Sequence, residues 1–179
     1  MQLDLSSNYF DLFDLPRQFE IDDGALQNRY RELQRNVHPD KFAAAEAAER
    51  RWSVQAAALI NSAHETLSKP LSRAAYLLKM EGVDLDMETD TQMAPQFLMT
   101  QMELREGLES IESSSDPFAA SDRARAEIGE SVGSISAAFA ANYSSGDFKA
   151  ARERAREWQF LDKLLREVAE IESRLDDNA

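Results

Sequence analysis

The sequence predicts an all-α protein with two helical regions, and three observations support this prediction. Apolar residues recur at helical spacing along most of the chain, and no segment shows the alternation that is typical of a β-strand. Glycine and proline number only six and five among 179 residues, and they stand where helices would end. The hydrophobic content of 43% and charged content of 30% are typical of a folded helical protein rather than a disordered chain.

The chain begins with signals for two helices. Asn8 can cap a short first helix, and Pro16 stops it because proline lacks the backbone N–H that a helix interior requires. Asp22 or Asp23 can cap the second helix. Its apolar residues follow one another at spacings of four, three and four, which places them on one face: Leu26, Tyr30, Leu33 and Val37.

Two further helices are expected before residue 82. The first runs from about residue 45 to residue 67, and its inward-facing candidates are Trp52, Leu59, Ile60, Ala63 and Leu67. His64 lies in this helix as a structural or surface residue, and we assign it no chemistry. The second helix runs from residue 71 to residue 81, and Gly82 follows as a typical helix stop.

The C-terminal half is predicted to be a helical bundle. Residues 83–93 carry four acidic and no basic residues, which favours a linker or a solvated turn. Asp116-Pro117 combines a cap with a proline at the first helical position, and Ser144-Ser145-Gly146-Asp147 is a short connection between helices. Three helices joined by short loops predict an antiparallel bundle, with helices over residues 95–112, 117–143 and 148–175.

The tripeptide His38-Pro39-Asp40 is the most informative feature of the sequence. Pro39 ends the second helix and pushes His38 out of the helical region, so both polar side chains are expected on a short exposed loop. Loops on helical scaffolds often carry recognition residues. A catalytic acid–base pair is the alternative, since histidine titrates near neutrality, but no nucleophile, metal site or pocket is visible beside it. A binding role is therefore favoured, and we expect no enzyme activity.

Charge and composition exclude several classes of protein. The net charge of −13 opposes binding to nucleic-acid phosphates. The absence of cysteine excludes disulfides, thiolate zinc sites and directly ligated iron–sulfur clusters, and two histidines do not build a usual zinc site unaided. We therefore predict no metal and no cofactor. The chain shows neither a signal peptide nor an apolar run of membrane-spanning length, so a cytoplasmic protein without a membrane partner is expected.

The predicted helix at residues 95–112 has two apolar faces. At 100° per residue, one face carries Phe97, Leu104, Leu108 and Ile111. The nearly opposite face carries a second apolar group rimmed by acids: Leu98, Met99, Met102, Glu103, Glu106 and Glu109. One apolar face is enough to join a bundle core, so the second is expected to bind a partner. The alternative is that other helices bury both faces.

Several segments resemble known families. About the first 75 residues resemble the J-domain, on the strength of Tyr9 to Pro16, the amphipathic second helix, His38-Pro39-Asp40-Lys41-Phe42, and Ile60-Asn61 with Leu67 and Pro70. Later segments resemble HscB, the family of J-domain co-chaperones of iron–sulfur cluster assembly: Arg73 to Leu78, Phe97-Leu98-Met99, Met102 to Glu106, and Phe160 to Leu164. This resemblance implies a J-domain at residues 1–78, a linker at 79–93 and a scaffold-binding three-helix domain at 94–179.

The resemblance also implies a function. It implies that the protein binds an IscU-type iron–sulfur scaffold protein and delivers it to HscA, a specialised seventy-kilodalton chaperone whose ATP hydrolysis the J-domain stimulates. The family's chaperone-binding positions correspond to His38, Pro39, Asp40, Lys41, Arg29, Arg31 and Arg35. Its scaffold-binding positions correspond to Leu98, Met99, Met102, Glu103, Glu106 and Phe160. Met102 replaces the more usual leucine, and Ser110 stands where another acid is expected, which Glu109 can partly replace.

The basic residues of the second helix allow two interpretations. Arg31 and Arg35 lie one turn apart and opposite the apolar stripe, while Arg29 flanks it and Lys41 follows in the loop. Such charges either keep a helix soluble or steer an acidic partner toward it. Two other functions also stay open, namely a J-protein for a different client with a dimerising bundle, and a purely structural helical protein. Self-association is not required in the favoured interpretation.

Overall fold

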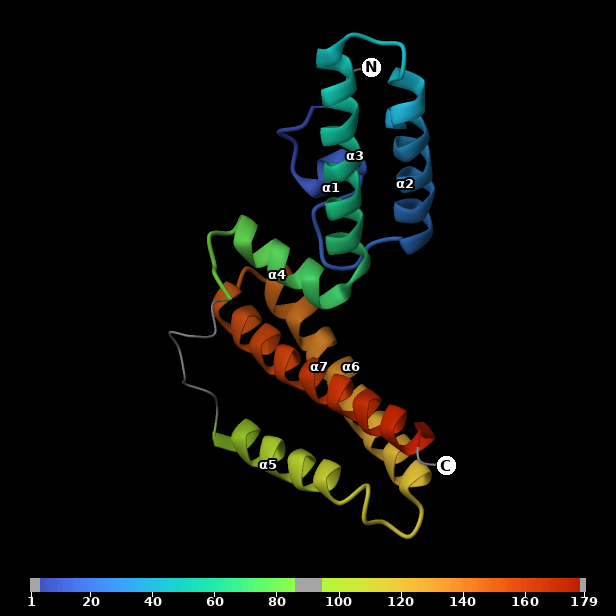
Figure 1. The fold of residues 1–179 in the computed structure, drawn as a ribbon. Coiled ribbons are helices and arrows are strands. Elements are labelled where there is room, and N and C mark those ends of the chain that lie inside the picture. Colours follow the sequence, from blue (N-terminus) through green and yellow to red (C-terminus); the bar gives the residue numbers. More distant parts are fainter. Residues whose placement is uncertain (1–3, 86–94, 178–179) are drawn as a thin grey trace. The chain divides into compact units, whose positions relative to one another are not determined.

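The computed structural model describes residues 4–85 and 95–177, and every regular element in these ranges is a helix (Figure 1). The chain divides into two compact units, Met1–Met80 and Glu81–Ala179. This division falls two residues after the predicted end of the J-domain at residue 78, because helix α4 continues through Met80. Most of the predicted linker at 79–93 lies outside the described residues, so it stays a prediction. No helix in the described ranges is long and apolar enough to cross a bilayer.

The first unit is built on a helical hairpin. Helices α2 (Asp23–Val37) and α3 (Ala47–Ser68) run antiparallel beside each other, and the short 3₁₀ helix η1 (Pro39–Phe42) forms part of their connection (Figure 1). The short α1 (Tyr9–Leu12) packs against α3, and α4 (Pro70–Met80) follows α3 almost directly. The predicted third and fourth helices are therefore present, with ends that differ from the prediction by one or two residues.

Local sequence explains where these helices begin and what they bury. The side chains of Asn8 and Asp22 each accept a hydrogen bond from a backbone N–H of the following turn, so both predicted caps are observed. The apolar stripe of α2 faces the core, although Tyr30 is only half-buried. Asp14 has φ +57°, a left-handed conformation that lets the chain turn after α1. The largest buried side chains of this unit are Phe10, Phe13, Leu26, Ile60, Leu67, Leu77 and Leu78.

Polar contacts join α2 to α3 along one side of the hairpin. The Tyr30 hydroxyl donates to Asn61 Oδ1 at 3.0 Å, and the Gln34 amide donates to the same oxygen. His64 stacks on Tyr30 with ring centroids 4.0 Å apart, and its Nε2 lies 3.0 Å from Gln27 Oε1. Partial burial lowers the pKa of His64, because burial disfavours the charged imidazolium. His64 therefore makes structural contacts between α2 and α3.

Helix α4 holds α1 and the loop that follows α1. The backbone N–H of Tyr9 donates to the Tyr76 hydroxyl at 3.0 Å, and the two rings stack with centroids 4.5 Å apart. Arg73 is buried, donates to the carbonyl of Leu67, and places its guanidinium 5.2 Å from the centroid of the Phe19 ring. These contacts stabilise a buried cation that is costly to desolvate, although its Nε has no hydrogen-bond partner within the described residues.

The second unit contains three helices. Helices α6 (Pro117–Ser144) and α7 (Phe148–Asp177) form a long antiparallel hairpin, and α5 (Pro95–Glu109) runs alongside them (Figure 1). The predicted three-helix bundle is therefore observed. Helix α5 ends three residues before the predicted position 112, yet Ile111 just beyond it is still buried. Gly146 turns the chain between α6 and α7 with φ +79°, a conformation that favours glycine.

The core of this unit is apolar and draws on all three helices. Leu104 and Leu108 of α5, together with Ile111, pack against Ile128 of α6. The α7 residues of this cluster recur at helical spacing: Leu161, Leu164, Val168 and Ile171. The inner face of α5 therefore joins the core as predicted.

An ion pair with a buried hydroxyl links α6 to α7. The Arg125 guanidinium donates to both carboxylate oxygens of Glu172, and the buried Ser121 hydroxyl donates to Glu172 Oε1 at 2.7 Å. Hydrogen bonds from Arg125 and Ser121 favour the charged carboxylate and hold the pKa of Glu172 below its usual range.

This network predicts a pH-dependent contribution to stability. A carboxyl whose folded-state pKa is lowered stabilises the fold above its unfolded pKa of about 4.3, and this contribution is lost as the pH falls through the lower folded value. Glu172→Gln should therefore lower the melting temperature near neutral pH, and the difference from the parent should shrink below about pH 4. Thermal melts across this range measure it. The control is Glu170→Gln on the same helix, where the carboxylate is exposed. A difference independent of pH would contradict the prediction.

Candidate functional site

Two surfaces carry the residues that the sequence singled out. We call the first the loop surface, and it belongs to the first unit: His38, Pro39, Asp40, Lys41, Arg29, Arg31 and Arg35. We call the second the α5 patch, and it belongs to the second unit: Leu98, Met99, Met102, Glu103, Glu106 and Phe160.

The loop surface begins where α2 is forced to end. Pro39 has no N–H to continue the helix, and His38 leaves the helical region with φ −54° and ψ 126°. Pro39 then starts the 3₁₀ helix η1, a position that suits its fixed φ and missing N–H. The sequence predicted the exposed loop, and the structure adds that Pro39–Phe42 form a short 3₁₀ helix within it.

His38 and Asp40 are both open to solvent. Their side chains are 56% and 91% exposed, and His38 Nδ1 accepts a 3.3 Å hydrogen bond from the backbone N–H of Asp40. The two side chains approach to 3.6 Å between Nδ1 and Oδ2, which is too long for a hydrogen bond. This arrangement presents an imidazole edge and a free carboxylate to a partner. It therefore favours recognition over proton transfer between the two groups.

Two contacts to α3 hold the loop in place. The hydroxyl of the buried Ser53 donates to the carbonyl of Val37 at 2.6 Å, and that carbonyl belongs to the last residue of α2. At the other end of the loop, Phe42 meets Trp52 edge-on with ring centroids 5.7 Å apart. The sequence did not reveal Ser53, because a single serine inside a helix gives no signal of the distant carbonyl that it will bind. The loop is therefore anchored at both ends.

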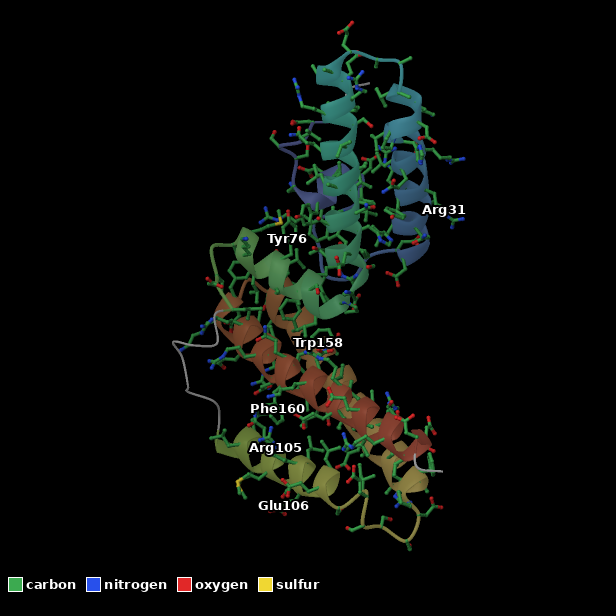
Figure 2. The ribbon with its side chains drawn as sticks, viewed as in Figure 1. Arg31, Tyr76, Arg105, Glu106, Trp158 and Phe160 are labelled. Carbon is green, nitrogen blue, oxygen red and sulfur yellow. The ribbon has the colours of Figure 1, made fainter. Side chains whose placement is uncertain are left out.

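The basic residues of the loop surface are not equivalent. Arg31 and Arg35 are exposed, and each Nε donates to the backbone carbonyl four residues earlier, which leaves the rest of the guanidinium open. Figure 2 shows Arg31 on the side of α2 that faces away from α3. Arg29 is half-buried and forms a 2.9 Å ion pair with Glu32, so its charge is largely neutralised. Arg31, Arg35 and the exposed Lys41 therefore supply the available positive charge.

The α5 patch is apolar and exposed at its centre. Leu98 is 43% exposed, and Met99 and Met102 are each 65% exposed, which is unusual for side chains of this size. Leu104 and Leu108 of the same helix are buried in the core. The predicted inner and outer faces of α5 are thus both observed, and the alternative in which both faces are buried does not hold for the described side chains.

The rim of the α5 patch is mixed in character. Glu103 and Glu106 are exposed, and Figure 2 shows Glu106 directed away from α7. Phe160 of α7 is half-buried, and its ring and that of Phe97 on α5 meet edge-on with centroids 5.9 Å apart. Arg105, which the sequence did not single out, lies 4.0 Å from Glu167 and connects α5 to α7.

The position where an additional acid was expected is occupied by a hydroxyl that is already engaged. Ser110 Oγ donates to the carbonyl of Gly107 at 2.7 Å, while the neighbouring Glu109 is exposed. Within the described ranges, no three histidine, cysteine or acidic side chains gather in a way that could hold a metal ion. Both surfaces offer exposed side chains for binding contacts.

Comparisons with known proteins agree with both units. Residues 8–76 match the DnaJ domain family, and residues 93–169 match the family described as the HSCB C-terminal oligomerisation domain. The co-chaperone HscB homolog of Photobacterium profundum is 43% identical, over 92% of this chain and 96% of the relative. The homolog of Vibrio cholerae is 41% identical, over 94% of this chain and 98% of the relative.

Two solved structures share the fold. HscB of Vibrio cholerae has a TM-score of 0.84 at 40% identity and covers 94% of this chain and 99% of its own. The human co-chaperone HscB has a TM-score of 0.85 at 31% identity, with 93% of this chain and 82% of the human chain covered. With its J-domain, its C-terminal bundle and relatives of this similarity along most of its length, the chain belongs to the HscB family of co-chaperones.

Proposed function

We propose that this protein is a co-chaperone, without enzyme activity of its own, in the assembly of iron–sulfur proteins. It holds an IscU-type scaffold protein on the α5 patch and presents it to an HscA-type seventy-kilodalton chaperone in the cytoplasm. The cluster on the scaffold is cargo and needs no ligand from this chain. One observation carries the proposal: a chain of the HscB family combines an anchored, exposed His-Pro-Asp loop with an exposed apolar helix face.

The loop surface acts on the chaperone by binding one of its states better than the other. A ligand shifts an equilibrium only through differential affinity for the two states. The loop must therefore fit the hydrolysis-competent state of the chaperone more closely than the other state. An anchored loop suits this role, because little conformational entropy is lost when it binds.

The α5 patch holds the scaffold through apolar contact. Leu98, Met99 and Met102 offer side chains that a partner can bury, and flexible methionines adapt to the shape of the opposite surface. The acidic rim of Glu103 and Glu106 favours a partner with basic residues around its apolar contact. Neither surface requires a second copy of this protein, so the proposed cycle needs no self-association.

Turnover of the chaperone ATPase tests the proposal directly. The rate is measured against the concentration of this protein, with and without the IscU-type scaffold. The proposal requires stimulation by the protein alone and further stimulation when scaffold is present. Stimulation without any scaffold effect, and without binding to purified scaffold, would instead support a J-protein for a different client. No stimulation at all would reject a co-chaperone role for this chaperone.

The first prediction concerns the loop. His38→Gln should abolish stimulation of the chaperone ATPase, since the exposed imidazole is lost from the contact surface. Stability should change by only about 0.5 kcal/mol, because exposed substitutions away from the core rarely cost more. Circular dichroism, thermal melting and ATPase assays on one preparation measure this, with scaffold binding as the control that should not change. A variant that stimulates the ATPase as strongly as the parent would contradict the proposed role of the loop.

A second prediction concerns the open guanidinium groups of α2. Arg31→Ala combined with Arg35→Ala should slow association with the chaperone, and the loss should be larger at low than at high ionic strength, because rim charges act mainly by steering. Stopped-flow association rates at several salt concentrations measure it. Arg29→Ala is the matched control and should have a smaller effect, since Arg29 is already paired with Glu32. If the double variant and the parent associate at the same rate at low salt, these arginines only keep the helix soluble.

The third prediction separates the two faces of α5. Leu98→Ala and Met102→Ala should weaken scaffold binding by about tenfold or more, since buried interface anchors typically lose about 2 kcal/mol on truncation. Their melting temperatures should stay close to the parent value, because both side chains are already exposed. Leu104→Ala and Leu108→Ala, on the buried face, should instead cost about 2–5 kcal/mol of folding stability. Calorimetry of binding and thermal melts measure both effects. If the Leu98 and Met102 variants lose stability and the Leu104 and Leu108 variants do not, the assignment of inner and outer faces is wrong.

A further inference from the structure

A groove lies beside the His-Pro-Asp loop in the first unit, and neither proposed surface accounts for it. Its walls come from the segment around α1, from α2, from η1 and from the first turns of α3. The groove is half-open and has a volume of about 780 Å³, which lies in the range of sites that hold ligands or peptide side chains. Helix α1 has only four residues, so it covers only a small part of this side of the hairpin.

The inner surface of the groove is apolar. Leu12, Leu33 and Val37 line it with side chains that are buried in the unit. Phe42 and Trp52 also line it, and both are half-buried although they touch each other edge-on. The exposed parts of these two rings are apolar area that a large side chain of a partner could cover. Aromatic side chains in such positions commonly anchor a partner.

The rim of the groove is acidic. Asp4, Asp11, Glu32 and Glu49 all line it and are all exposed. Arg29 is the one cation among the described lining residues, and it is paired with Glu32. This charge is a local feature, because Met1–Met80 as a whole holds eleven acidic and ten basic residues.

The charges argue against the acidic segments of this chain as the occupant. Residues 83–93 carry four acidic and no basic residues, and Glu81–Ala179 carries twenty-two acidic against ten basic residues. Such segments would be repelled by the acidic rim, as would an anionic small molecule. An occupant therefore needs positive charge for the rim and apolar side chains for the two rings.

We infer that this groove binds a short segment of another protein, in which one or two large apolar side chains stand between arginines or lysines. The apolar side chains lie against Phe42 and Trp52, and the basic residues face Glu49, Asp4 and Asp11. Glu49 is the best placed of these acids to test, because it lines the groove, is exposed, and forms no ion pair within the described residues. Among the described lining residues only Arg29 also belongs to the loop surface, and the residues that contact the segment belong to neither surface proposed above.

Nuclear magnetic resonance of the full chain labelled with nitrogen-15 tests the inference. The chain has two tryptophans, so the indole N–H of Trp52 reports on the groove and that of Trp158, on α7, serves as an internal reference. The probe is the peptide acetyl-Arg-Leu-Phe-Arg-amide, and its charge-inverted control is acetyl-Glu-Leu-Phe-Glu-amide. The basic peptide should shift the Trp52 signal saturably and leave Trp158 unchanged, while the acidic peptide should shift neither.

Two matched variants locate the contact. Glu49→Gln should weaken binding of the basic peptide about threefold, as expected for the loss of one exposed ion pair. Glu46→Gln removes the same charge three residues earlier, on an exposed residue that does not line the groove, and should leave the affinity unchanged. The inference is overturned if no saturable Trp52 shift occurs, if both peptides bind equally, or if the two variants weaken binding by the same factor.

Discussion

The geometry of the loop surface depends on one buried hydrogen bond at the end of α2. Pro39 prevents the helix from continuing, so the carbonyl of Val37 has no helical partner and would be costly to bury alone. The Ser53 hydroxyl on α3 donates to it at 2.6 Å, and the Phe42–Trp52 contact fixes the other end of the loop. His38 and Asp40 therefore project from a connection whose two ends are fixed. The loop loses little conformational entropy when it binds a partner.

In the second unit, helix α5 has two apolar faces, one in the core and one exposed. Leu104 and Leu108 pack in the core, and the contacts of Phe97 and Arg105 with α7 further stabilise the position of α5. The outer face can then stay exposed without loosening the helix. The acidic excess of this unit also discourages contact between the patches of two copies, because like charges repel when they approach. An exposed apolar face thus stays available for a partner of opposite charge.

The sequence predicted those features that depend on neighbouring residues. Asn8, Asp22 and Asp116 act as caps because each needs only a backbone N–H of the next turn, and the apolar spacing of α5 defines its faces through helix geometry. Ser53 could not be found in this way, since its acceptor lies sixteen residues away and only the packed hairpin brings the two together. The pairing of Arg29 with Glu32, in contrast, follows an i, i+3 spacing that the sequence contained.

The two proposed surfaces rely on different forces, and this difference suits a delivery function. The loop surface is small, polar and cationic, so its encounters are fast, sensitive to salt and dependent on the state of the chaperone. The α5 patch is apolar, and contacts of this kind act mainly on the dissociation rate. On the proposed function, a scaffold held on the patch therefore remains bound while the loop meets and leaves the chaperone. On the proposed function, the protein needs this order of lifetimes, because a cargo released before the chaperone contact forms would not be delivered.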